Sequence, residues 1–154
     1  METEVLLKEP EMPETNFTAE ERAAMKGRAK ELRTASKRGA ASKADGESDL
    51  LAAIDEMPPA DRAMAERIHA LVQQNAPDLV PRTWYGQPAW ATQAGKVVCF
   101  FQATAKFKTR YATFGFNEPA NLDDGTMWAT SFALLDLSAA DEKKLGALIK
   151  KAAG

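Results

Sequence analysis

Hydrophobic positions are sparse over the first part of the chain and follow only a thin helical stripe. Residues 1–16 hold five glutamates and two prolines, a composition that predicts a disordered acidic tail. Thr18 and Glu21 have the spacing of a capping box, so we expect a helix to begin there and to run to Arg38. So thin a stripe predicts that this helix docks only peripherally. Its apolar positions are Met25, Leu32 and several alanines.

Small and polar residues interrupt the helical pattern at residues 39–46. Glycine stands at both ends of this run, which favours a loop over continued helix. We therefore expect a basic helical extension at residues 17–44, followed by one compact domain at residues 45–154. A chain of 154 residues is long enough for one hydrophobic core.

Hydrophobic positions at helical spacing return after this loop. Ser48 can cap a short helix that the pair Pro58 and Pro59 terminates. Its apolar positions are Leu51, Ile54 and Met57. A longer helix opens at the same prolines, because the first helical turn tolerates proline, and its apolar face is the clearest in the sequence. That face consists of Met64, Ile68, Leu71 and Val72. His69 flanks this face, so we expect a boundary or solvated imidazole.

The pattern then changes to short runs rich in aromatic and β-branched residues, which predict strands. The candidate strands are residues 84–92, 96–104, 110–116 and about 130–137, with Ala94–Gly95 joining the first two as a hairpin. Ser138 and Asp141 predict the start of a C-terminal helix, whose inner face is Leu145, Leu148, Ile149 and Ala152. Together these elements predict an α+β fold in which an antiparallel sheet of about four to five strands is backed by helices, with an N-terminal helical extension.

Composition and charge narrow the classes of protein to consider. The formal net charge of −2 gives no global attraction to nucleic acid or to an anionic membrane. Cys99, the only cysteine, lies in an apolar run, so we expect a buried, inert thiol in a reducing compartment. The sequence shows no secretory signal and no apolar stretch near the roughly 20 residues that a membrane-spanning helix needs. We therefore expect a cytoplasmic location and no membrane partner.

Eleven of the twelve aromatic residues lie between Trp84 and Phe132, and large aromatics are the ordinary filling of a core. A subset also admits a functional interpretation. Gly86 and Pro88 interrupt a strand-like aromatic stretch, and such an irregular edge can form the lip of a pocket. Basic residues flank Phe107 in a connection between strands, which suits an anionic or nucleotide-like ligand, although a solvated turn is the simpler interpretation. The candidate ligand-binding residues are Trp84, Tyr85, Gln87, Trp90, Lys106, Lys108 and Arg110.

The sequence offers few residues for catalysis. With one histidine and one cysteine, a zinc site of the common Cys/His type is excluded. Neither a phosphate-binding glycine loop nor a nucleophile elbow is present. Asp55, Glu56 and Asp61 are weak candidates for binding a hard cation, although acidic clusters on such helices are usually a solvated face. We assign no catalytic residue and lean toward a protein that is not an enzyme.

Three segments together with the order of the elements carry a family resemblance. They are Trp84-Tyr85-Gly86-Gln87-Pro88-Ala89-Trp90, Gly95-Lys96-Val97-Val98-Cys99-Phe100-Phe101 and Lys106-Phe107-Lys108. From about Ser48 to the C-terminus the chain resembles the YdhG-like bacterial proteins, a family long labelled as a domain of unknown function. The resemblance implies a compact α+β fold, and one branch of the family has been proposed to act as a frataxin-like iron chaperone. We expect no cofactor from the residues themselves, and iron enters as a possible ligand through the resemblance alone.

The chain departs from the family pattern at one place. Many relatives have a histidine just after the basic connection, whereas no histidine lies between Gly95 and Phe116 here. A role that rests on that imidazole cannot be carried over. The basic helix also lies outside the resembling segment.

Three functional hypotheses follow. The first is a non-catalytic protein that binds a small ligand or a protein partner at the aromatic and basic sheet surface, with iron handling as a special case. The second is a small enzyme that uses carboxylate and Lys/Arg groups in a pocket. The third, ranked last, is an adaptor whose basic N-terminal helix contacts nucleic acid or an acidic partner. Glu20, Glu21 and Glu31 share that helix and weaken the third hypothesis.

Overall fold

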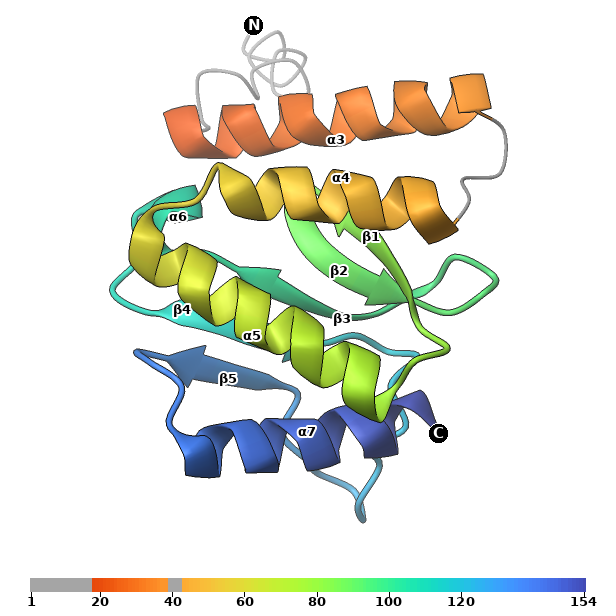
Figure 1. Cartoon of the computed structure of the whole chain (residues 1–154), viewed down its shortest axis with the longest axis vertical. Coiled ribbons are helices and arrows are strands. Elements are labelled where there is room, and N and C mark those ends of the chain that lie inside the picture. Colours follow the sequence, from red (N-terminus) through yellow and green to blue (C-terminus); the bar gives the residue numbers. More distant parts are fainter. Residues whose placement is uncertain (1–17, 39–42) are drawn as a thin grey trace, which may run out of the picture.

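The computed structural model describes residues 18–38 and 43–154, and Figure 1 shows their arrangement. Five antiparallel strands form one sheet in sequential order. The strands are β1 (Val80–Trp84), β2 (Gln87–Ala91), β3 (Val97–Gln102), β4 (Ala112–Phe116) and β5 (Ser131–Leu134). The helices in the described part are α3 (Ala19–Arg38), α4 (Lys43–Asp55), α5 (Pro59–Asn75), the single turn α6 (Thr104–Phe107) and α7 (Ala139–Ala153). The predicted α+β fold with an N-terminal helix is confirmed.

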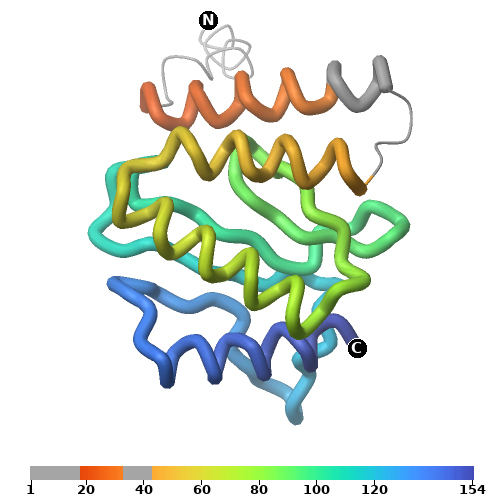
Figure 2. The backbone as a smooth tube through the Cα atoms, viewed as in Figure 1, coloured from red at the N-terminus to blue at the C-terminus, as the bar shows by residue number. Residues whose placement is uncertain are grey.

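Helices α4, α5 and α7 cover one face of the sheet, which we call the inner face (Figures 1 and 2). Helix α4 packs on β1 and β2, and α5 packs against both α4 and α7. The strand register places Pro81, Trp90, Cys99 and Phe116 opposite one another across four strands, on this inner face. The side chains of Trp90, Phe101 and Phe114 are essentially inaccessible to solvent there. The aromatic residues are therefore mainly core, as the simpler interpretation of the sequence expected.

The first predicted strand is in fact two strands. Residues 84–92 contain the end of β1 and all of β2, joined by a two-residue turn at Tyr85 and Gly86. Both turn residues have positive φ, 55° and 76°, which is the left-handed pair that a tight hairpin requires. A tyrosine rarely adopts that conformation, so the sequence signalled the turn only through Gly86. Strand β1 lies at the edge of the sheet, where Pro81 costs no ladder hydrogen bond.

Helix α4 begins earlier than the sequence suggested. It starts at Lys43, so the predicted loop is wrong for residues 43–46, and Ser48 lies inside the helix instead of capping it. Gly46 is buried against β1, where a Cβ atom would lie 3.2 Å from the carbonyl carbon of Pro81 and closer still to its oxygen. This glycine therefore permits a close approach of helix to strand and does not break the helix. Residues 39–42 lie outside the described part, as does the predicted acidic tail at 1–16.

The remaining helix signals are confirmed. Thr18 and Glu21 exchange the two hydrogen bonds of a capping box, and so do Ser138 and Asp141. Helix α5 opens with proline in its first turn, and its predicted apolar face is buried. The predicted inner face of α7 is buried or partly buried. No helix among residues 18–38 and 43–154 combines the length and the apolar content needed to cross a membrane.

Candidate functional site

The predicted ligand-binding residues divide between the two faces of the sheet. Trp90 lies on the inner face, where it is 1% exposed. Trp84 and its cross-strand partner Gln87 lie on the opposite, outer face, because side chains alternate along β1 and Pro81 points inward. On that outer face the ring of Trp84 lies 5.3 Å from the ring of Phe100. Trp84 and Trp90 therefore do not share a site.

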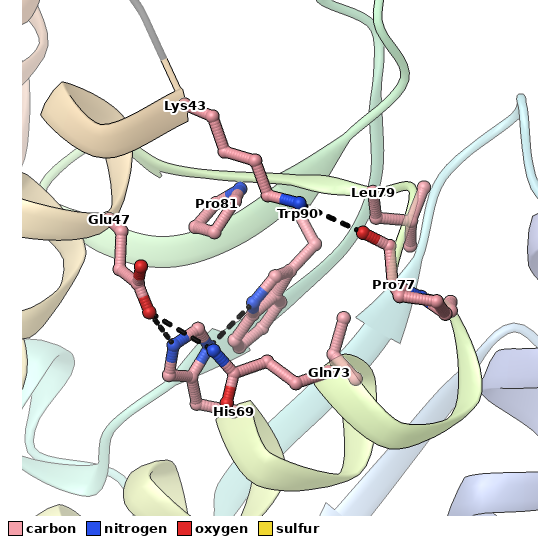
Figure 3. Close-up of a pocket in the computed structure, with 10 residues that line it drawn as sticks. Lys43, Glu47, His69, Gln73, Pro77, Leu79, Pro81 and Trp90 are labelled. Atoms are coloured by element: carbon pink, nitrogen blue, oxygen red, sulfur yellow. Dashed lines mark hydrogen bonds and ion pairs between the residues drawn. The ribbon is translucent and has the colours of Figure 1, made fainter.

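A cavity of about 240 Å³ lies on the inner side, between α4, α5 and the first two strands (Figure 3). Its lining includes Lys43, Glu47, His69, Gln73, Pro81 and Trp90. His69 is 6% exposed, so the expectation of a boundary or solvated imidazole was wrong. Helix α4 shields His69 from solvent, because Glu47 of that helix is hydrogen-bonded to the imidazole.

The hydrogen bonds around His69 fix which of its nitrogens carries the proton. The indole Nε1–H of Trp90 donates to Nδ1 of His69 at 3.1 Å, and indole can only donate. Nδ1 is therefore unprotonated, and Nε2–H donates to Oε2 of Glu47 at 3.0 Å. The side-chain amide of Gln73 donates to the same oxygen at 3.0 Å. Neither ring nitrogen keeps a lone pair for a substrate or a metal ion, so His69 serves to orient Trp90 and Glu47.

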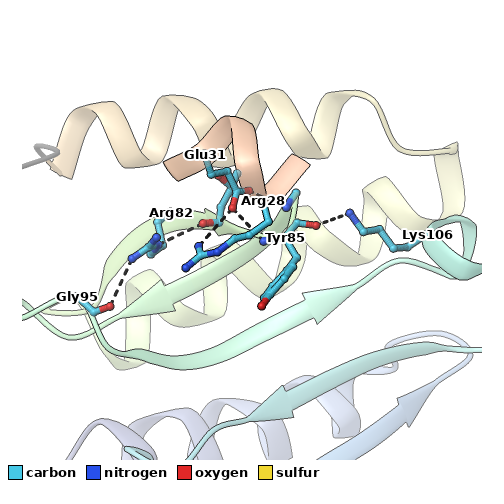
Figure 4. Close-up of polar contacts among 8 residues, drawn as sticks. Arg28, Glu31, Arg82, Tyr85, Gly95 and Lys106 are labelled. Atoms are coloured by element: carbon cyan, nitrogen blue, oxygen red, sulfur yellow. Dashed lines mark hydrogen bonds and ion pairs between the residues drawn. The ribbon is translucent and has the colours of Figure 1, made fainter. Parts of the chain in front are cut away.

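A larger groove of about 480 Å³ opens on the outer face. Arg28 of α3 joins Arg82 and Trp84 of β1 along it, and Figure 4 shows Arg28 and Arg82 close together. The rest of the lining is Gly95, Val97, Asn117, Glu118 and Pro119, so the groove holds two guanidinium groups, one carboxylate and one indole.

Both arginines of this groove are poorly satisfied by the protein. The Nη1 atom of Arg28 is buried without a hydrogen-bond partner and lies 3.6 Å from a carboxylate oxygen of Glu31, too far for a hydrogen bond. Among the described residues, the guanidinium of Arg82 donates to two backbone carbonyls, at 3.2 Å to Thr83 and 3.4 Å to Gly95. Both guanidinium groups can therefore donate hydrogen bonds to an anionic ligand in the groove.

Helix α3 lies over the β1–β2 turn and is attached to it by polar contacts (Figure 4). The carboxylate of Glu31 accepts hydrogen bonds from the backbone N–H groups of Tyr85 at 3.0 Å and of Gly86 at 2.6 Å. Lys106 of α6 donates to the carbonyl oxygen of Tyr85, and its partial burial lowers the pKa of its ammonium group while nearby Glu31 opposes that shift. Lys108 pairs with Glu20 at 2.9 Å. Two predicted residues, Tyr85 and Lys108, thus contact acidic side chains of α3, and Lys106 lies within electrostatic range of Glu31.

Two further predicted residues lie apart from these contacts. The guanidinium of Arg110 stacks 5.2 Å from the centre of the Tyr111 ring and lines neither described cavity. Gln87 is buried, and its Oε1 atom has no hydrogen-bond partner.

The three acidic residues predicted as weak cation ligands do not converge. Asp61 is 2% exposed, and its two carboxylate oxygens accept hydrogen bonds from the Thr104 hydroxyl and from the backbone N–H groups of Thr104 and Ala105. It therefore anchors the start of α6. Asp55 and Glu56 are exposed near the end of α4. Within residues 18–38 and 43–154, no group of three or more His, Cys, Asp or Glu side chains is placed to hold a metal ion.

Comparison with family models, with curated proteins and with solved structures found no match for this chain. The resemblance to the YdhG-like family therefore stays a prediction.

Proposed function

We propose that this protein is a non-catalytic binding protein that holds a small anionic ligand with an aromatic group in the outer groove. The observation that carries the proposal is the pair Arg28 and Arg82 beside Trp84, where one guanidinium nitrogen of Arg28 makes no hydrogen bond and has only the carboxylate of Glu31 at 3.6 Å. A guanidinium N–H group without a hydrogen bond is costly to keep from water, and an oxyanion in the groove would supply a charge-assisted hydrogen bond to the arginine pair. The indole of Trp84 offers a surface on which an aromatic ring can stack.

The size and charge of the groove define the ligand class. About 480 Å³ falls within the range of roughly 300–1,000 Å³ typical of small-molecule sites. Two arginines against Glu118 leave a net positive lining, which favours a carboxylate or phosphate group over a cation. A mononucleotide combines such an anion with a flat ring, and is the simplest probe of both features.

The test compares three probes: adenosine monophosphate, adenosine and inorganic phosphate. Adenosine lacks the charge and phosphate lacks the ring, so the proposal expects both to bind more weakly than the nucleotide in isothermal titration calorimetry. Binding should also quench tryptophan fluorescence saturably, and Trp84→Phe should remove that signal. Arg82→Gln should weaken nucleotide binding by about tenfold or more, the size of a lost charge-assisted hydrogen bond.

Arg62→Gln is the matched control, because Arg62 lies on α5 and lines neither described cavity. It should bind the nucleotide as the wild type does. If none of the three probes binds, or if the Arg62 and Arg82 variants behave alike, the outer groove is not the binding site we propose.

The alternative functions have less support from the described residues. An adaptor that uses α3 would have to rely on exposed residues such as Lys26 and Lys30, because Arg28 and Glu31 face the sheet. Iron handling rests on the family resemblance, with no converging ligand set in the described residues. A carboxylate enzyme would need an acid or base free to act in a cavity, and in the inner cavity Glu47 and His69 are bonded to each other.

A further inference from the structure

The docking of α3 depends on unusually little apolar contact. Among its described side chains only Ala24 is a buried hydrophobic residue, whereas Met25 and Leu32 are 40% and 54% exposed. The ion pair between Glu20 and Lys108 is at the surface, with the lysine side chain 79% exposed, and such pairs stabilise little. Among the side chains of α3 that the structure describes at residues 19–32, the segment around Glu31 makes the most specific of the contacts given above.

That segment is matched to the turn beneath it. The two-residue turn leaves the N–H groups of Tyr85 and Gly86 outside the strand ladder, and the carboxylate of Glu31 accepts from both. Gly27 lies against the same turn, since a Cβ atom there would be 3.8 Å from the nitrogen of Gly86. The guanidinium of Arg28 lies 5.3 Å from the centre of the Tyr85 ring. The turn thus offers two N–H groups that bind one carboxylate, and Glu31 of α3 supplies that carboxylate.

The same contacts set the position of a groove residue. Arg28 and Glu31 are three residues apart on one helix face, so docking Glu31 on the turn brings Arg28 to the groove. Whenever α3 lifts away, the groove loses one of its two guanidinium groups. A ligand that contacts Arg28 then binds only the docked fraction of the molecules, and its apparent affinity falls with that fraction.

We propose that α3 is a movable lid on the outer groove and that Glu31 is the positioning residue that holds the lid closed. The inference rests on the proposed function, because the lid acts on the same groove. Ligand binding and lid docking are coupled, so an anion in the groove holds α3 in place and release of α3 lowers affinity for the anion.

The decisive variant is Glu31→Gln, since an amide has only one acceptor atom and turns its NH₂ group toward a backbone donor. Hydrogen–deuterium exchange of the ligand-free protein should show faster exchange in α3 for this variant. Glu20→Gln makes the same charge change on the same helix but removes only the surface ion pair with Lys108, so it should speed exchange in α3 far less than Glu31→Gln does. Adding adenosine monophosphate to the wild type should slow exchange in α3.

The affinity for the nucleotide distinguishes a positioning role of Glu31 from a simple effect of its charge. Glu31→Gln removes a negative charge near the groove, so a purely electrostatic effect would tighten nucleotide binding. A lid held by Glu31 requires the opposite, a loss of affinity of several-fold, with Glu20→Gln affected far less. Equal or tighter binding by the Glu31 variant overturns the lid, as does unchanged exchange in α3.

The proposed function and the lid can fail separately. Arg82→Gln should weaken nucleotide binding while leaving exchange of ligand-free α3 as in the wild type, because Arg82 lies on β1 and does not contact the turn amides. If no probe binds the wild type, the proposed function fails, and the lid is then judged by exchange alone: exchange that is much faster in the Glu31 variant than in the Glu20 variant supports it, and equal exchange refutes it.

Discussion

Gly46 gives the sharpest test of how α4 is attached to the sheet. A Cβ atom at this position would lie 3.2 Å from the carbonyl carbon of Pro81 and 3.7 Å from the Cα atom of Arg82, with the carbonyl oxygen nearer than either. Carbon atoms in contact normally lie about 3.5–4.0 Å apart. The obstacle is backbone of β1 and cannot rotate away, so Gly46→Ala must push α4 off the strand.

The expected magnitude comes from two opposing effects. Alanine gains about 1 kcal/mol over glycine in a helix interior. Overpacking of a tight site costs about 1–3 kcal/mol, and a backbone obstacle places this case at the upper end or beyond. The shift would also loosen Leu50 and Ile54, which are 0% and 1% exposed in α4. We expect Gly46→Ala to lower the free energy of unfolding by about 2 kcal/mol, and the thermal midpoint by about 4–8 °C.

Gly27→Ala is the matched control for this experiment. It is also a glycine inside a helix, but a Cβ atom there meets nothing closer than 3.8 Å. The variant keeps the propensity gain without the overlap, so its stability should equal or exceed that of the wild type. Urea denaturation followed by circular dichroism measures both. Should Gly46→Ala prove as stable as Gly27→Ala, the close approach of α4 to β1 would be wrong.

Two further predictions concern capping carboxylates. Asp61→Asn should destabilise the fold by about 1–3 kcal/mol in urea denaturation, because an amide cannot accept from all the donors of Thr104 and Ala105, whereas Asp55→Asn, at an exposed site, should change little. Hydrogen bonds from Ser138 lower the pKa of Asp141 below 3.8, so this cap stabilises α7 fully above that pH and is lost as the pH falls through the lowered value. Asp141→Asn removes the titrating carboxylate and should therefore flatten the dependence of stability on pH between about pH 5 and pH 2 relative to the wild type, and an unchanged pH profile would contradict the cap.

Elements with local signals could be predicted from the sequence. The capping pairs of α3 and α7 and the prolines of α5 act within one helical turn, and all three helices begin where those signals lie. Strand β1 has no such signal, because its proline and its pairing with β2 make sense only once it is placed at a sheet edge. His69 was misjudged for a related reason. Its place beside the apolar stripe of α5 would leave it solvated, but α4 covers that flank.

The part of the candidate site around the β1–β2 turn could be predicted from the sequence, and the part that α3 contributes could not. Trp84 and Tyr85 lie at the turn itself, and Lys106 contacts it from 21 residues further along the chain. The glycine of the turn and the basic residues around Phe107 indicated a recognition surface. Arg28 and Glu31 come from a helix more than fifty residues earlier than the turn they contact. No local pattern connects segments so far apart, and without homologous sequences nothing else could have paired them.

The residue types on the docking face of α3 explain why a search for hydrophobic periodicity does not find that face. Among the side chains that the structure describes, those that contact or approach the rest of the protein include Glu20, Ala24, Gly27, Arg28 and Glu31, which recur at helical spacing but are small or charged. A search for an apolar stripe finds Met25 and Leu32, and both are exposed. Burying apolar area gives α5 a permanent place in the core, whereas backbone N–H groups and charges that water can also satisfy hold α3 with a small net free energy. An element attached in this way can dock and release at little cost, which is the property that a lid over the arginine groove requires.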